Sequence, residues 1–186
     1  MSDTPRTEKL DYFSAGLAIL YSLYYTVLRL FHLYPSSRQR LITSQPQHPR
    51  SRLLTLWTGL CIILYLIHVS YLTLTSRFDY TYNVIANLIL GILHNLLWVY
   101  YSFPSKFINP FPLRPLGYSP PHSYKAAFVA VLTTAATALE LFDFPPWGRI
   151  IDAHALWHLA TAPIVVLWWS FLIQDALDDG WRPGRV

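Results

Sequence analysis

Charged residues are scarce in this chain. Of its 186 residues only 13% are Asp, Glu, Lys or Arg, whereas 53% are hydrophobic. An ordinary soluble domain carries about 25% charged residues, so the composition excludes a typical soluble protein and indicates an integral membrane protein. The formal net charge of +4 comes from basic residues scattered over the polar loops, and the sequence therefore predicts no nucleic-acid partner.

Cysteine and glycosylation signals are also nearly absent. The single cysteine, Cys61, lies in an apolar segment, which excludes an intrachain disulfide and a cysteine-based metal cluster. No Asn-x-Ser/Thr sequon occurs, and the polar start of the chain is followed by an apolar segment too long for a cleavable signal sequence. Orientation in the membrane must therefore be read from other residues.

Five apolar segments are long enough to cross a bilayer, which takes about 20 apolar residues for roughly 30 Å of hydrocarbon. Because lipid offers the backbone no hydrogen-bond partner, these segments must be helices. The sequence thus predicts an all-α, polytopic transmembrane helix bundle in which residues 1–186 form a single domain. The five spans are predicted at residues 12–34, 53–75, 80–102, 124–142 and 154–176.

The basic residues predict how these helices are oriented. Of the 14 Lys and Arg residues, ten lie on the side of the first loop, the proline-rich loop and the C-terminus, and four lie on the other side. Lys and Arg accumulate in cytosolic loops, so we expect a cytosolic C-terminus. Asp11, His154 and His158, at the starts of the first and fifth spans, then share the non-cytosolic level. Glu140 and Asp143 gather at this level too.

Two histidines stand four residues apart in the segment Asp152-Ala153-His154-Ala155-Leu156-Trp157-His158. On a helix, positions i and i+4 lie on one face about 6 Å apart, so His154 and His158 could bind one zinc ion together. An ionisable group inside a membrane segment is costly and usually marks a functional site. The alternative is that both rings lie at the headgroup level beside Trp157, where polar-tipped rings are stable.

A zinc ion at this position would suit hydrolysis. The metal polarises a carbonyl and acidifies a bound water, so that an ester or an amide reacts at neutral pH. A carboxylate such as Asp11 would orient a histidine or take the proton of the water. Haem fits poorly, because its axial histidines approach from opposite faces. Of the other histidines, His94 is expected to make interhelical hydrogen bonds and His122, in the proline-rich loop, to be solvated.

Four short motifs stand in order along the chain. They read Thr7-Glu8-Lys9-Leu10-Asp11-Tyr12-Phe13, Phe78-Asp79-Tyr80-Thr81-Tyr82-Asn83, Leu141-Phe142-Asp143-Phe144-Pro145-Pro146 and Asp152-Ala153-His154-Ala155-Leu156-Trp157-His158. In these motifs the chain resembles the Per1-like family of post-GPI-attachment to proteins factor 3 proteins. That family is part of a superfamily of seven-span membrane hydrolases that includes the alkaline ceramidases. The last motif is the most specific of the four.

The resemblance implies a function. Family members remodel the lipid of GPI-anchored proteins by removing the sn-2 acyl chain, a phospholipase A2-type step, in the endoplasmic reticulum or the Golgi. The superfamily's zinc is held by three histidines, two of them from the last span, with an aspartate and a serine nearby. His154 and His158 match that pair, and Asp11 matches the aspartate. We therefore expect GPI-anchored proteins and membrane lipids as partners, and the endoplasmic reticulum membrane, with the Golgi as second choice, as the location.

The family's third histidine and its serine have no counterpart here. Both would fall before Met1, as would the first two of the seven spans, so the chain resembles the C-terminal part of a family member. We therefore expect the chain as given to bind zinc weakly and to hydrolyse little lipid. Two alternatives stay open: a non-catalytic membrane protein that binds lipid or GPI-anchored proteins, and a ceramidase-like amide hydrolase.

Overall fold

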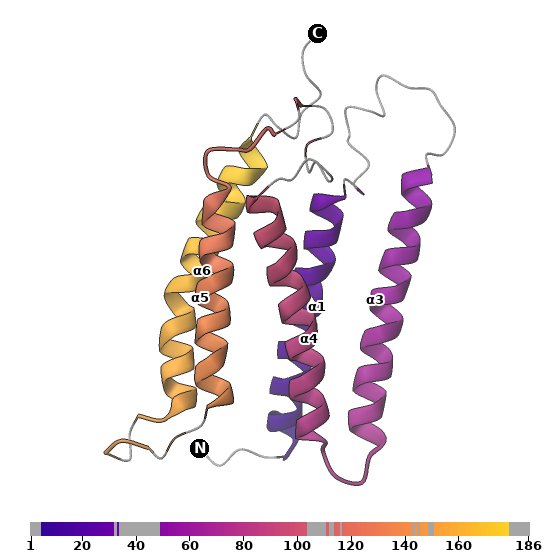
Figure 1. Cartoon of the computed structure of the whole chain (residues 1–186). Coiled ribbons are helices and arrows are strands. Elements are labelled where there is room, and N and C mark those ends of the chain that lie inside the picture. Colours follow the sequence, from indigo (N-terminus) through magenta and orange to yellow (C-terminus); the bar gives the residue numbers. More distant parts are fainter. Residues whose placement is uncertain are drawn as a thin grey trace. The chain divides into compact units, whose positions relative to one another are not determined.

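The computed structural model describes residues 5–31, 33, 49–103, 111, 114, 115, 117–142, 144, 146–148 and 151–178; at 5–8, 49–51, 140 and 154 this covers the backbone alone. The described residues form five helices (Figure 1). They are α1 (Pro5–Leu30), α3 (Pro49–Leu74), α4 (Tyr80–Ser102), α5 (Tyr124–Leu141) and α6 (Ala153–Leu177). The prediction of an all-α chain is confirmed, and most of the two predicted cytosolic loops lies outside the described residues.

Four of the five helices are long and apolar enough to cross a membrane. Their apolar spans are Lys9–Leu30, Arg52–Leu74, Tyr80–Ser102 and Ala155–Leu177. The third predicted span coincides with α4, whereas α1 starts seven residues before its predicted span. It does so because a helix readily begins on a proline, here Pro5, and then continues through the polar residues before Tyr12.

The fourth predicted span agrees with helix α5 except that the helix ends one residue earlier, at Leu141. Helix α5 has 18 residues, and its apolar part is Tyr124–Leu139. At 1.5 Å per residue the whole helix is ~27 Å long, slightly less than the hydrocarbon thickness. A difference of this size is accommodated by local thinning of the bilayer.

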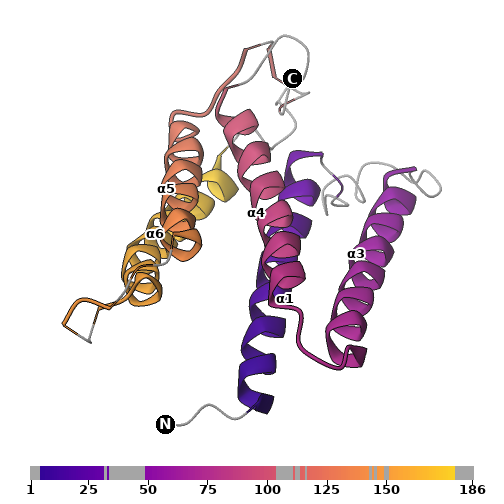
Figure 2. The same cartoon turned by 60° about the horizontal axis from the view of Figure 1, so that its bottom comes forward.

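The chain divides into two compact units, Met1–His94 and Asn95–Val186, and α4 contributes to both. Each unit has its own core, and Figure 2 shows the same helices from a second direction. The prediction that residues 1–186 form one bundle stays a prediction.

In the first unit, polar side chains connect α1 to α3. The Tyr65 hydroxyl donates to the carbonyl of Phe13 at 3.1 Å, and the hydroxyls of Tyr24 and Thr58 lie 3.1 Å apart. Because Phe13 precedes Tyr24 while Tyr65 follows Thr58, the two helices run antiparallel. Near the start of α1, the ring of Tyr12 lies 5.1 Å from that of Phe78, just before α4 begins.

In the second unit, α5 lies beside α6 in both views (Figures 1 and 2). Ser102, at the end of α4, accepts a hydrogen bond from the Ala127 backbone at 2.9 Å, and thereby satisfies a donor in the first turns of α5. The Trp98 and Phe171 rings meet edge to face at 5.2 Å, and both side chains are fully buried. These contacts join α4, α5 and α6 into one packed unit.

Gly16 provides a test of the packing in the first unit. A Cβ atom at Gly16 would lie 3.3 Å from Oδ1 of Asn87 and 3.6 Å from Nε2 of His68, whereas one at Gly91 would meet nothing within 4 Å. We expect Gly16→Leu to lower the free energy of unfolding by about 1–3 kcal/mol through overpacking, measured by thermal unfolding in detergent. Gly91→Leu is the matched control. Equal midpoints for the two variants would contradict this packing.

Candidate active site

A tight turn and a helix cap fix the start of α6. The backbone N–H of Trp147 donates to the carbonyl of Ile151 at 2.8 Å, and that of Ile151 donates back at 3.2 Å. Gly148 sits between them with a φ of 60°, a left-handed conformation that glycine adopts without strain. Asp152 then caps the helix, since its carboxylate accepts from the Ala155 N–H at 2.7 Å. The first turn of α6 therefore has a defined position.

His154 and His158 both lie on this helix, as predicted. They are separated by four residues, about 6 Å of helix rise, within the unbroken helix Ala153–Leu177. The His158 side chain is exposed, and its ring lies 4.6 Å from that of Trp157. The side chain of His154 lies outside the described residues, so a shared zinc ion stays a prediction.

Asp11 lies in the other unit. Its side chain is exposed near the start of α1, and among the described residues its carboxylate makes no hydrogen bond, although its carbonyl accepts from Ser14 at 2.9 Å. With no hydrogen-bond partner in the part of the chain that the structure describes, this carboxylate is available for chemistry. The convergence of Asp11 with the histidine pair stays a prediction.

The two histidines at the start of α6 are of a residue type that zinc takes as a ligand, and they would supply part of a ligand set. A catalytic zinc site usually takes three protein ligands and keeps one open position. Among the described side chains, which exclude that of His154, no three His, Cys, Asp or Glu residues are placed to hold a metal ion. Asp152 is occupied as the helix cap, and both Asp143 and the Glu140 side chain lie outside the described part of the chain.

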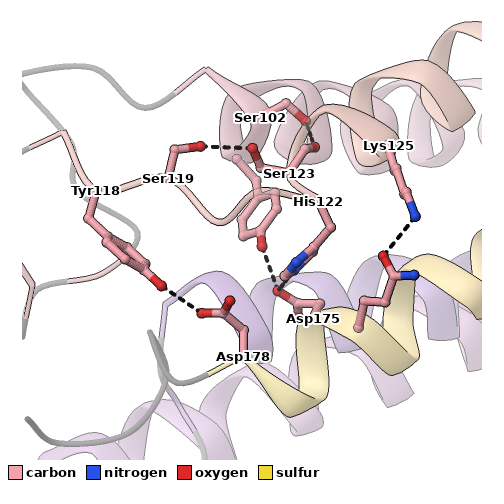
Figure 3. Close-up of polar contacts among 10 residues, drawn as sticks. Ser102, Tyr118, Ser119, His122, Ser123, Lys125, Asp175 and Asp178 are labelled. Carbon is pink, nitrogen blue, oxygen red and sulfur yellow. Dashed lines mark hydrogen bonds and ion pairs between the residues drawn. The ribbon is translucent and has the colours of Figure 1, made fainter.

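A second polar cluster occupies the opposite end of α6, and sequence reasoning missed it (Figure 3). The prediction that His122 is solvated is wrong: its side chain is 11% exposed, and its Nε2 lies 3.9 Å from Oδ1 of Asp175. Asp175 is fully buried and accepts from the Tyr101 hydroxyl at 2.6 Å. The available signal was an aspartate at the end of an apolar span, where a charge requires a partner.

This cluster contains serine, histidine and aspartate but is not arranged as a nucleophile with its base. The hydroxyls of Ser119 and Ser123 lie 2.8 Å apart, and among the described residues neither is hydrogen-bonded to His122. A serine nucleophile needs a base within about 2.6–3.2 Å. The candidate active site therefore remains at the start of α6.

Comparison with known proteins identifies the same family that the sequence motifs indicated. The model of the Per1-like family matches residues 1–176. The chain belongs to the Per1-like family. Among its relatives, the Protein PER1 homolog of Schizosaccharomyces pombe is 39% identical over 95% of this chain and 47% of the relative. No solved structure matches the chain.

Two further relatives carry the name GPI-specific phospholipase A2-like PGAP3. The protein of Xenopus tropicalis is 38% identical over 94% of this chain and 47% of its own length. That of Homo sapiens is 37% identical over 94% of this chain and 46% of its own length. This Per1-like chain thus spans about half the length of the curated relatives it matches, and Asp11, His154 and His158 all lie within the part matched by the family.

The cap of α6 in this Per1-like chain yields a prediction. Asp152→Ala removes the acceptor for the Ala155 N–H and should cost the helix start about 1 kcal/mol, so amides of the first turn should exchange roughly fivefold faster. Hydrogen exchange of the peptide at the start of α6 measures this. Asp152→Ser, which retains a capping hydroxyl, should stay near the parent. Parent-like protection in Asp152→Ala would show that the cap does not hold this turn.

Proposed function

We propose that this chain is the membrane-embedded catalytic part of an enzyme that remodels the lipid of GPI-anchored proteins. The reaction is hydrolysis of the sn-2 acyl ester, a phospholipase A2-type step that yields a free fatty acid and a lyso-lipid anchor. The observation that carries the proposal is the His-x-x-x-His pair on the capped first turns of α6, in a chain of the Per1-like family. Membership of that family and the names of the PGAP3 relatives support it.

His154 and His158 would hold a zinc ion with their imidazole nitrogens, with at least one further ligand from outside the pair. When bound, zinc supplies an acidified water and polarises the ester carbonyl. The tight turn at Trp147–Ile151 and the Asp152 cap keep the backbone of the pair in place, which a metal site needs because its ligands tolerate little displacement.

Asp11 would act as the general base. A carboxylate within hydrogen-bond reach of the attacking water takes its proton, and the same group returns a proton to the departing sn-2 oxygen. The carboxylate of Asp11 is exposed and makes no hydrogen bond to the described residues, so it suits this role better than Asp152 or Asp175, whose carboxylates accept hydrogen bonds.

The proposal includes a location. The excess of Lys and Arg on the side of the C-terminus places that end in the cytosol and the start of α6 on the luminal side. GPI-anchored proteins present their lipid in the luminal leaflet, so the pair would face its substrate. We place the protein in the endoplasmic reticulum membrane, as a multi-pass protein.

Replacing either histidine tests the site. His154→Ala or His158→Ala in the complete protein should abolish release of the sn-2 acyl chain and lower the zinc content, because each removes one of the metal ligands. His94→Ala, on α4, is the control and should leave most of the activity. The readouts are mass spectrometry of the GPI lipid and metal analysis of the purified protein. An unchanged acyl composition in the first two variants would refute the site.

Asp11→Asn separates catalysis from metal binding. If Asp11 is the base and not a ligand, the variant should retain its zinc and lose at least about 10²-fold in hydrolysis rate. Asp79→Asn is a matched control in the same unit: Asp79 accepts from the Tyr82 backbone N–H at 2.9 Å, and asparagine caps a helix equally well. Loss of zinc in Asp11→Asn, or a parent-like rate, would remove Asp11 from this role.

A further inference from the structure

Three hydrogen bonds hold the last turn of α6 to three different segments (Figure 3). The Tyr101 hydroxyl at the end of α4 donates to Oδ1 of Asp175 at 2.6 Å. Lys125 on α5 donates to Oε1 of Gln174 at 2.8 Å, and Tyr118, from the connection before α5, donates to Oδ1 of Asp178 at 2.9 Å. We call this set the C-terminal clamp. Its members are Tyr101, Tyr118, Lys125, Gln174, Asp175 and Asp178.

Asp175 is the centre of the clamp. Its side chain is 0% exposed, and the rings of Phe111 and Phe171, each 5.8 Å from the ring of its partner Tyr101, are buried as well. A buried carboxylate is tolerated when it is hydrogen-bonded or paired, and removing its partner costs far more than an exposed contact would. The Tyr101 hydroxyl meets that need, and His122 lies 3.9 Å away on the same side. The carboxylate is therefore restricted to one orientation.

The rest of α6 offers weaker constraints on its rotation. In its apolar span Ala155–Leu177 only two residues, Phe171 and Asp175, are buried in the protein. Lipid tails are as apolar as the side chains that pack against them, so apolar packing alone resists rotation or sliding of a membrane helix weakly. Hydrogen bonds are directional, and the partners come from three segments, namely α4, α5 and the connection before α5. The clamp therefore restrains the rotation and the depth of α6.

We propose that Asp175, held by Tyr101, is a positioning residue for the histidine pair. The positioning role of Asp175 rests on the proposed function, whereas the contacts that hold α6 do not depend on it. His158 lies 17 residues before Asp175, about 25 Å along the same helix. A rigid helix carries rotation along its length, and a turn of about 20° would move a ring about 6 Å from the axis by roughly 2 Å. Catalytic groups tolerate about 0.5 Å.

Pro163 lies between the clamp and the pair. Proline removes one backbone hydrogen bond and bends a helix, but α6 continues on both sides of it from Ala153 to Leu177. The helix can therefore still transmit rotation from Asp175 to His158. If Pro163 instead acts as a free joint, changes at the clamp will not reach the pair, and the experiment below detects that outcome.

Tyr101 and Tyr100 form a matched pair for this test. Tyr101→Phe removes the hydroxyl that donates a hydrogen bond to Asp175, whereas the Tyr100 hydroxyl is buried and has no hydrogen-bond partner among the described residues. Spin labels at Leu159 on α6 and Val131 on α5, both exposed, report the position of α6 in a Cys61→Ala background. Pulsed electron paramagnetic resonance in lipid nanodiscs then gives the distribution of distances between the two labels.

In Tyr101→Phe we expect the distance to shift by about 2 Å or its distribution to broaden, and in Tyr100→Phe to match the parent. Asp175→Asn keeps an oxygen acceptor for Tyr101 and should show the parent distance, whereas Asp175→Leu should not. Tyr101→Phe is isosteric, so the test stands even if Asp175→Leu fails to fold. Identical distributions for Tyr101→Phe and Tyr100→Phe would overturn the proposal.

Hydrolysis by the complete protein provides the second readout. Displacing the pair by 1–2 Å should lower the rate per folded molecule by about 10–100-fold in Tyr101→Phe while the amount of folded protein stays close to that of Tyr100→Phe. A shifted distance with an unchanged rate would refute the positioning role. A parent protein that hydrolyses no GPI lipid would refute the proposed function, whereas the distance measurements would still decide what the clamp does.

Discussion

Hydrocarbon supplies no hydrogen-bond partners, so each polar group in a membrane span must find one inside the protein or serve a purpose that offsets its cost. This constraint divides the polar side chains into those that are hydrogen-bonded within the protein and those that are available for chemistry. Asn95 donates to Thr134 at 2.9 Å, Ser102 accepts from the start of α5, and Asp175 accepts from Tyr101, so these groups are structural. The carboxylate of Asp11 has no such partner among the described residues and stays available for chemistry.

Along helix α6, hydrogen-bonded polar groups lie at the two ends and apolar residues lie between them. Its first turn is defined by the Trp147–Ile151 turn and the Asp152 cap, and its last turn by the C-terminal clamp. Between them runs an apolar segment that is largely exposed and suited to contact with lipid. The histidine pair is thus carried on a helix fixed at both ends by directional contacts, a mechanical requirement of any site that must hold a metal ion at the membrane boundary.

Hydropathy predicted the helices well, because a span must be both long and apolar. It placed α4 at its observed bounds and overestimated α5, whose apolar part ends at Leu139. The His-x-x-x-His motif placed two imidazoles on one helix and led to the correct family. The clamp escaped prediction because Tyr101 and Asp175 are 74 residues apart, and because a proline-rich loop suggested that His122 was solvated. Pairings at that separation are set by packing and leave no periodic signal.

The central claim is that His154 and His158 bind one zinc ion, and X-ray absorption spectroscopy at the zinc edge tests it most directly. The complete protein, purified with its metal, should show nitrogen ligands at about 2.0–2.1 Å with imidazole scattering. His158→Ala should reduce the imidazole contribution by one ligand, while Asp11→Asn should leave it unchanged. A spectrum that His158→Ala does not alter, in a protein that retains zinc, would show that the metal lies elsewhere and would contradict the account.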